Sequence, residues 1–85
     1  MEYIVVSFRS REHTVKFSGY LTARGIPNSI INTPKEAGVG CGLSVKINKN
    51  AFFVVKNLLS TGRPNSFAGF FSVTETHGRR AVKTI

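Results

Sequence analysis

The chain has 85 residues, of which 41% are hydrophobic, and its 12 Lys and Arg against 4 Asp and Glu give a formal net charge of +8 at pH 7. This length predicts one small domain with a thin core, and the hydrophobic fraction excludes a disordered chain. A single cysteine excludes an intramolecular disulfide, a zinc cluster built on several thiolates and a thioredoxin-type cysteine pair. The positive charge favours anionic partners.

The sequence offers no candidate for a membrane segment, because no stretch approaches the roughly 18 to 20 apolar residues that a membrane span needs. The first residues, MEYIVV, contain an acid and continue directly into a strand pattern, which is not typical of a secretion signal. We therefore expect a cytoplasmic protein without a membrane partner. In the reducing cytosol the thiol of Cys41 stays free for chemistry.

The first half of the chain predicts a strand, a helix and a second strand. Residues 3–8 (YIVVSF) form a continuous run of β-branched and aromatic residues, which indicates a central strand. Ser10 can cap a helix that ends before Gly25. Residues 26–33 (IPNSIINT) predict a second strand, and Pro27 near its start favours the edge of a sheet.

The middle of the chain predicts a loop, a strand and a second helix. Residues 34–42 (PKEAGVGCG) are rich in glycine and predict a loop, and residues 43–47 alternate as a third strand with one polar face. A second helix is expected over residues 51–59, with Asn48 or Asn50 as its cap. The inner face of this helix is expected to consist of Phe52, Val55 and Leu59.

The end of the chain predicts a fourth strand over residues 67–74, followed by a polar and basic tail over residues 75–85. The tail leaves two alternatives open, a short fifth strand or a frayed end. The resulting order is βαββαβ. Its most economical arrangement is an α+β ferredoxin-like sandwich, in which an antiparallel four-stranded sheet carries both helices on one face. We expect a single domain over residues 1–74.

The stretch most informative about function is Gly-Val-Gly-Cys-Gly-Leu, residues 38–43. The neighbouring glycines leave the thiol of Cys41 without shielding side chains, and the amides of Gly40 and Gly42 can turn toward an anion. A second interpretation stays open. In it, Gly40 and Gly42 only form a hairpin turn, and Cys41 is a small buried hydrophobic residue.

The predicted topology brings positive charge toward this thiol. The third strand runs antiparallel beside the first, so its start lies near the end of the first strand and the N-terminus of the first helix. Cys41 would then face Arg9, Arg11 and the helix amides, which lower the pKa of a thiol from about 8.5 toward 7 or below. His13 and His77 are too few and too far apart to form a metal site with Cys41. The sequence predicts no metal and no cofactor.

Several segments carry a family resemblance. They are the first strand, the helix end Arg-Gly-Ile-Pro (24–27), and the segment Thr-Pro-Lys-Glu (33–36) that leads to Gly-Cys-Gly-Leu (40–43). Over roughly residues 3–74 the chain resembles the DUF3343 family of Se/S carrier protein-like proteins, whose cysteine corresponds to Cys41. The chain departs from the family in its large excess of basic over acidic residues and in its basic tail over residues 75–85. It also lacks the Cys-Pro-x-Pro motif of the better-understood small sulfur carriers.

The resemblance implies a small carrier that holds sulfur or selenium on Cys41 as a persulfide or selenosulfide. Its partners would be a donor protein and an acceptor protein, and it would not be an enzyme that turns over a metabolite. The amides of Gly40 and Gly42 and the charges of Arg9 and Arg11 would bind the anion. The alternative function is a nucleic-acid-binding or regulatory interaction module that acts through its basic surface.

Overall fold

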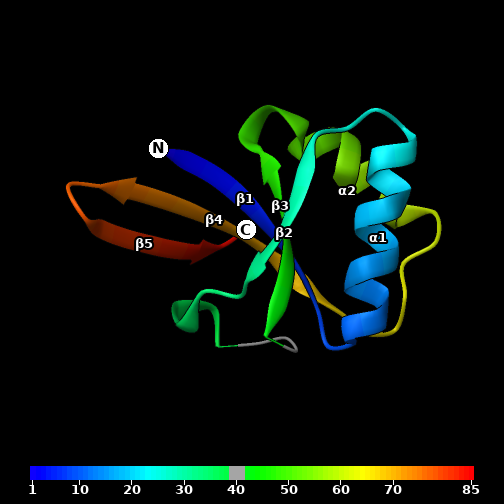
Figure 1. The fold of residues 1–85 in the computed structure, drawn as a ribbon, viewed down its shortest axis with the longest axis horizontal. Helices are drawn as coiled ribbons and strands as arrows, with labels where there is room; N and C mark the ends of the chain where they lie inside the picture. Colours follow the sequence, from blue (N-terminus) through cyan, green and yellow to red (C-terminus); the bar gives the residue numbers. More distant parts are fainter. Residues whose placement is uncertain (39–41) are drawn as a thin grey trace.

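The computed structural model describes residues 1–38 and 42–85 and has the α+β class that the sequence predicts (Figure 1). Two short 3₁₀ turns join the larger elements, η1 (Lys35–Ala37) and η2 (Lys49–Ala51). In chain order, the helices and strands are β1 (Glu2–Phe8), α1 (Arg11–Ala23), β2 (Asn28–Asn32), β3 (Leu43–Asn48), α2 (Phe52–Ser60), β4 (Phe67–Thr76) and β5 (Arg79–Thr84).

The strands form one antiparallel sheet in the order β2-β3-β1-β4-β5. The expectation of four strands is wrong, because the basic tail supplies β5, which pairs with β4 from Arg79 to Thr84. The two residues between these strands, His77 and Gly78, have φ angles of 49° and 77°. Positive φ at both positions is typical of the type I′ turn that closes a two-residue hairpin. β2 is an edge strand, as Pro27 indicates.

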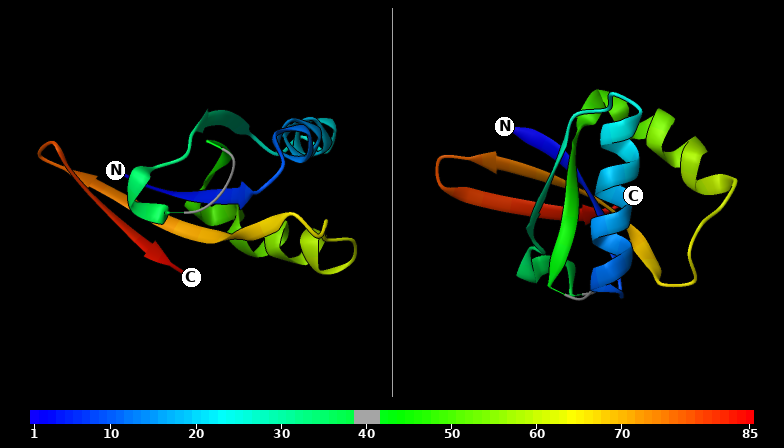
Figure 2. Two further views of the ribbon diagram at one scale, coloured as in Figure 1. Left: turned by 90° about the horizontal axis from the view of Figure 1, so that it is seen from below. Right: turned by 45° about the vertical axis from the view of Figure 1, so that its right-hand side comes forward.

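Both helices lie on the same face of the sheet (Figures 1 and 2). Alternate residues of β1 point to this face, because successive side chains of a strand point in opposite directions. They form one apolar cluster with residues of both helices, including Leu21 of α1 and Leu59 of α2. The members of this cluster that come from β1 are Ile4, Val6 and Phe8. The expected inner face of α2 is confirmed, since Val55 and Leu59 are buried and Phe52 packs against them.

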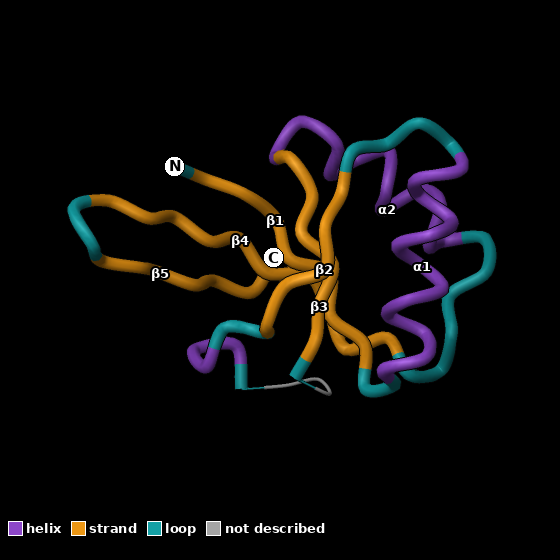
Figure 3. The backbone as a smooth tube through the Cα atoms, in the orientation of Figure 1, coloured by secondary structure: helices purple, strands orange, loops and turns teal. Residues whose placement is uncertain are grey.

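A smaller apolar cluster lies on the opposite face of the sheet, where Tyr3 and Val5 pack with Phe71 and Val73 of β4. Apolar side chains from β2, η1 and β5 cover it, namely Ile31, Ala37 and Val82. The hairpin of β4 and β5 and the connection through η1 lie on this side of the molecule, away from the helices (Figures 1 and 3). β1 is therefore buried on both faces, which explains its continuous apolar sequence.

The ends of the helices differ in how their backbone groups are satisfied. Ser10 caps α1 as predicted, because its hydroxyl accepts a hydrogen bond of 3.2 Å from the backbone N–H of His13. The predicted asparagine cap of α2 is wrong, since Ala51 stands at the cap position and makes no side-chain bond. The turn η2 leads directly into α2 and satisfies the first backbone N–H of the helix, because the N–H of Phe52 donates to the carbonyl of Lys49. In the described ranges no helix has the length and apolarity to cross a membrane.

Candidate functional site

Two of the predicted site residues, Gly40 and Cys41, lie outside the described residues. The other three are described. Arg9 follows β1 and Arg11 begins α1, and both side chains are exposed. Gly42 directly precedes β3 and has a φ of 96°, a conformation that side chains with a Cβ rarely adopt. A glycine is therefore required at this position for the backbone to enter β3.

The strand register brings these described residues to one end of the sheet. Ser7 of β1 pairs with Ser44 of β3. Because the strands are antiparallel, Arg9 and Gly42, each two residues beyond this pair, lie at the same end. The connection from α2 to β4 reaches this end as well, since the N–H of Arg9 donates to the carbonyl of Ser66 over 2.6 Å. The N-terminus of α1 also lies at this end of the sheet (Figure 1).

A chain of hydroxyl groups lies next to this end of the sheet. The Oγ atoms of Ser7 and Ser44 are 2.9 Å apart, and both residues are 0% exposed. The Oγ of Ser44 lies 2.6 Å from Oγ1 of Thr33, which follows β2. The three hydroxyls therefore join the chain after β2 to β3 and β1. Sequence reasoning missed this network, and its one signal in the sequence is a serine in each of the two strands, Ser7 in β1 and Ser44 in β3.

The two ends of the connection between β2 and β3 are also joined through the backbone. The N–H of Thr33 donates to the carbonyl of Gly42 over 2.8 Å. Pro34, the next residue, is buried. The turn η1 then ends at Gly38, which has a φ of 66°. The residues on both sides of the predicted Gly-Cys motif are thus held against the sheet.

An ion pair fastens the same connection to β5. Nε and Nη2 of Arg80 donate to Oε2 and Oε1 of Glu36 over 3.2 and 3.0 Å, in a two-bond arrangement that matches the shapes of the two groups. The hydrogen bond to Arg80 is the main reason that the pKa of Glu36 lies below its ordinary value of 4.5. The same pair raises the pKa of Arg80. Nothing local in the sequence indicates this contact, which joins residues 44 positions apart.

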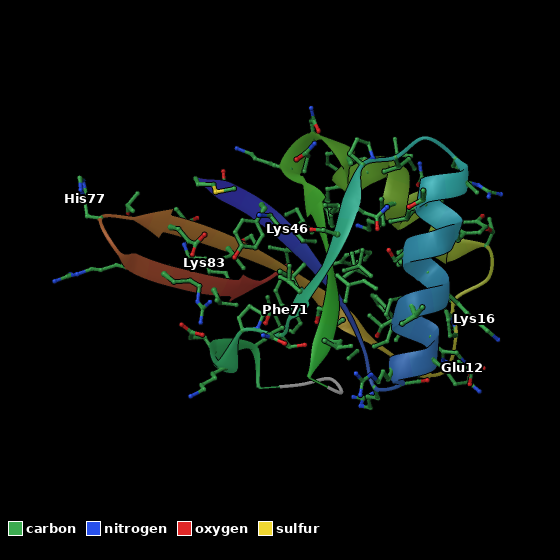
Figure 4. All side chains as sticks on the ribbon, in the orientation of Figure 1. Glu12, Lys16, Lys46, Phe71, His77 and Lys83 are labelled. Atoms are coloured by element: carbon green, nitrogen blue, oxygen red, sulfur yellow. The ribbon has the colours of Figure 1, made fainter. Side chains whose placement is uncertain are left out.

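The histidines occupy separate parts of the molecule. Nδ1 of His13, on α1, shares a hydrogen bond with Oγ of Ser66. His77 lies at the tip of the hairpin of β4 and β5, far from α1 (Figure 4). Among residues 1–38 and 42–85, no group of three or more His, Cys, Asp and Glu side chains is placed to hold a metal ion. The described part of the site therefore consists of cationic side chains, hydroxyls and backbone groups.

A chain of this fold, with a glycine-flanked cysteine in its sequence, matches one known family. The family model described as "Putative Se/S carrier protein-like" matches residues 2–64. The match covers more than half of the chain, so the chain belongs to this family, and the resemblance seen in the sequence is confirmed. The matched part runs from β1 to the connection after α2 and contains every predicted site residue. Neither curated proteins nor solved structures give a match.

Proposed function

We propose that the protein carries sulfur or selenium on Cys41, which it receives from a donor protein and passes to an acceptor protein. The observation that carries this proposal is the family match, because the family is described as Se/S carrier-like and the matched residues include Cys41. The placement of Gly42, Arg9 and Arg11 at one end of the sheet supports it. Cys41 is the sole cysteine of the chain and thus the sole thiol that can hold the atom.

The transfer is an exchange between thiolates. The thiolate of Cys41 attacks the outer sulfur of a persulfide on the donor, so that a new S–S bond forms on Cys41 and the S–S bond of the donor breaks. The electron pair of the broken bond leaves with the donor thiolate, and no net oxidation occurs. An acceptor thiolate then attacks the same outer sulfur and releases Cys41. Selenium follows the same steps through a selenosulfide.

The surroundings of Cys41 favour its anionic forms in this proposal. Arg9 and Arg11 supply positive charge, and the first turn of α1 adds the partial positive charge of a helix N-terminus. The amides of Gly40 and Gly42 are the proposed hydrogen-bond donors. A thiolate and a persulfide anion are both stabilised by such groups, which lower the pKa of the thiol. A second thiol is missing from the sequence, so the sulfur can leave only to another molecule.

We further propose that β1 to β4 and the two helices form a ferredoxin-like βαββαβ unit, which β5 extends. The strand order β2-β3-β1-β4 and the placement of both helices on one face support this assignment. The proposed location is the cytoplasm, where the thiol stays reduced between transfers.

Sulfur loading tests the proposed function. The protein is incubated with a cysteine desulfurase and cysteine, and its intact mass is measured. We expect the gain of one sulfur atom, which dithiothreitol removes. The variant Cys41→Ser should stay folded and gain no sulfur. At neutral pH, Arg9→Gln combined with Arg11→Gln should load more slowly than wild type, because a smaller share of the thiol is ionised.

Two controls make this result decisive. The variant Lys83→Gln removes a positive charge from β5 and should load at the wild-type rate. Selenium is tested in parallel with selenocysteine and a selenocysteine lyase. If the wild-type protein gains neither atom, or if Cys41→Ser unfolds the chain, Cys41 is a packing residue and the carrier proposal is wrong.

A further inference from the structure

The helix α2 has apolar side chains on more than its inner face. Val55 and Leu59 are buried in the core, yet Phe53 is 72% exposed and Val54 is 53% exposed. Phe53 lines a hollow beside η2, together with Lys49 and Asn50. The side of α2 that carries Val54 is the one that leads to α1, and clustered exposed apolar side chains mark surfaces that a partner covers.

A groove runs between α2 and α1, with a volume of about 300 Å³. Leu58 of α2 lines it and lies one helical turn after Val54, so both side chains are on the same side of the helix. Phe17 and Leu59 form its apolar floor, and His13, Lys16 and Tyr20 of α1 form its other wall. The groove thus has an apolar floor and a polar rim, which is the composition expected of a binding site.

The α1 wall of the groove is held in place by side-chain contacts. Tyr20 stacks on Phe17, with 6.1 Å between ring centroids and 19° between planes. The guanidinium of Arg24 lies 3.7 Å above the ring of Tyr20. At the other end, His13 is hydrogen-bonded to Ser66. A preformed wall lowers the entropy that a partner must lose on binding.

The charges beside the groove identify the kind of partner. Lys16 lines the groove, and Arg24 lies over the ring of Tyr20, which also lines it. Arg63 lies between two residues that line the groove. Glu12 offsets one of these charges through its ion pair with Lys16, which is 3.2 Å long. A second copy of the chain carries +8 as well and is repelled. An acidic partner is attracted.

We infer that the groove between α1 and α2 is the docking site for an acidic amphipathic helix of a partner protein. Apolar residues on one face of that helix enter the groove against Leu58 and Phe17, and its carboxylates face Lys16 and Arg24. The end of the groove marked by His13 lies at the N-terminus of α1, the end of the sheet at which β3 begins. The inference goes beyond the proposed function and does not depend on Cys41.

The test uses a synthetic amphipathic helix of about 18 residues, or five turns, with leucine on one face and glutamate on the other. It is titrated into isotope-labelled protein, and amide chemical shifts are followed by NMR. We expect saturable shifts in α1 and α2 and an affinity that falls as salt rises. The double variant Lys16→Glu, Arg24→Glu should bind the peptide at least about tenfold more weakly than wild type.

Matched controls separate docking from general charge attraction and from the thiol. Lys83→Glu changes a charge on β5 and should leave the affinity unchanged, and so should Cys41→Ser. The same peptide with lysine in place of glutamate should not bind. The inference is overturned if the glutamate peptide gives no saturable shifts, if the shifts lie on β2 or β5, or if Lys83→Glu weakens binding as much as the double variant. Failure of sulfur loading with intact peptide binding would affect the proposed function alone.

Discussion

The buried hydroxyls of Ser7 and Ser44 show how a single residue can hold the candidate site together. Each hydroxyl lies in a sheet that is otherwise apolar at this depth, and each has a partner. A buried polar group without a partner costs about 1–3 kcal/mol, whereas a hydrogen bond that is made contributes about 0.5–1.5 kcal/mol. The network therefore favours one arrangement of β1, β3 and Thr33, and this arrangement sets where the connection after Thr33 begins and ends.

Replacement of Ser44 tests this network. Ser44→Ala leaves the hydroxyl of Ser7 buried without its partner, and we expect the free energy of unfolding to fall by about 1–3 kcal/mol. The measurement is the urea midpoint at constant slope. The double variant Ser7→Ala, Ser44→Ala is the control, because it removes both ends of the bond. It should cost less than the sum of the single variants, and full additivity would show that the two hydroxyls are not coupled.

At the scale of elements, the ion pair of Glu36 and Arg80 links the turn η1 to β5. The folded-state pKa of Glu36 is lowered below 4.5, so its contribution to stability is present above that pH and is lost as the pH falls through the folded value. Both side chains are partly exposed, with exposed fractions of 42% and 37%, so water weakens the pair and the effect on global stability is small. The expected consequence is local, at η1.

A carboxylate titration followed by NMR tests this link. In wild type Glu36 should titrate below 4.5, and Arg80→Gln should return its pKa toward that value. The amides of η1 should exchange faster in this variant, because the turn has lost its contact with β5. Arg79→Gln is the matched control, since neighbouring residues of a strand point to opposite faces. An unchanged pKa of Glu36 in Arg80→Gln would contradict the role of the pair.

The elements that the sequence predicts are those with a local signal. The apolar run of β1 and the capping serine of α1 act over a few residues, and both predictions are confirmed. β5 has a weak local signal, and its pairing depends on a turn and on the apolar contact of Val82 with the smaller cluster. The hydroxyl chain and the ion pair connect residues 37 and 44 positions apart, so they follow from the fold and not from a motif.

For the candidate site, the sequence predicts the end of the sheet at which the described residues meet, because the antiparallel pairing of β1 and β3 follows from the order of elements. The sequence does not predict what fixes the connection there. Thr33 and Glu36 belong to the segment that carries the family resemblance, yet their partners are Gly42, Ser44 and Arg80, which only folding brings near. The roles of Gly40 and Cys41 stay predictions.

At the scale of the whole molecule, the charge of +8 is spread over many elements. Arg9 and Arg11 lie at one end of α1, and Arg24 lies at the other. Lys56 is on α2, and Arg79 is on the hairpin. Ion pairs with glutamates involve further cations, Lys16, Lys49 and Arg80. This distribution differs from the single basic face that indicates a nucleic-acid-binding surface.

We therefore predict that binding to single-stranded RNA is weak and depends on phosphate contacts. The dissociation constant should be about 10⁻⁴ to 10⁻⁶ M at physiological salt, as for non-specific complexes, and the logarithm of the affinity should fall linearly with the logarithm of the salt concentration. Fluorescence anisotropy with labelled homopolymers and mixed sequences across a salt series measures both properties. Because phosphates are the same in every sequence, the affinities should differ little between them. Sequence-selective binding that persists at high salt would contradict this prediction and would favour nucleic-acid recognition over sulfur or selenium transfer as the function of the protein.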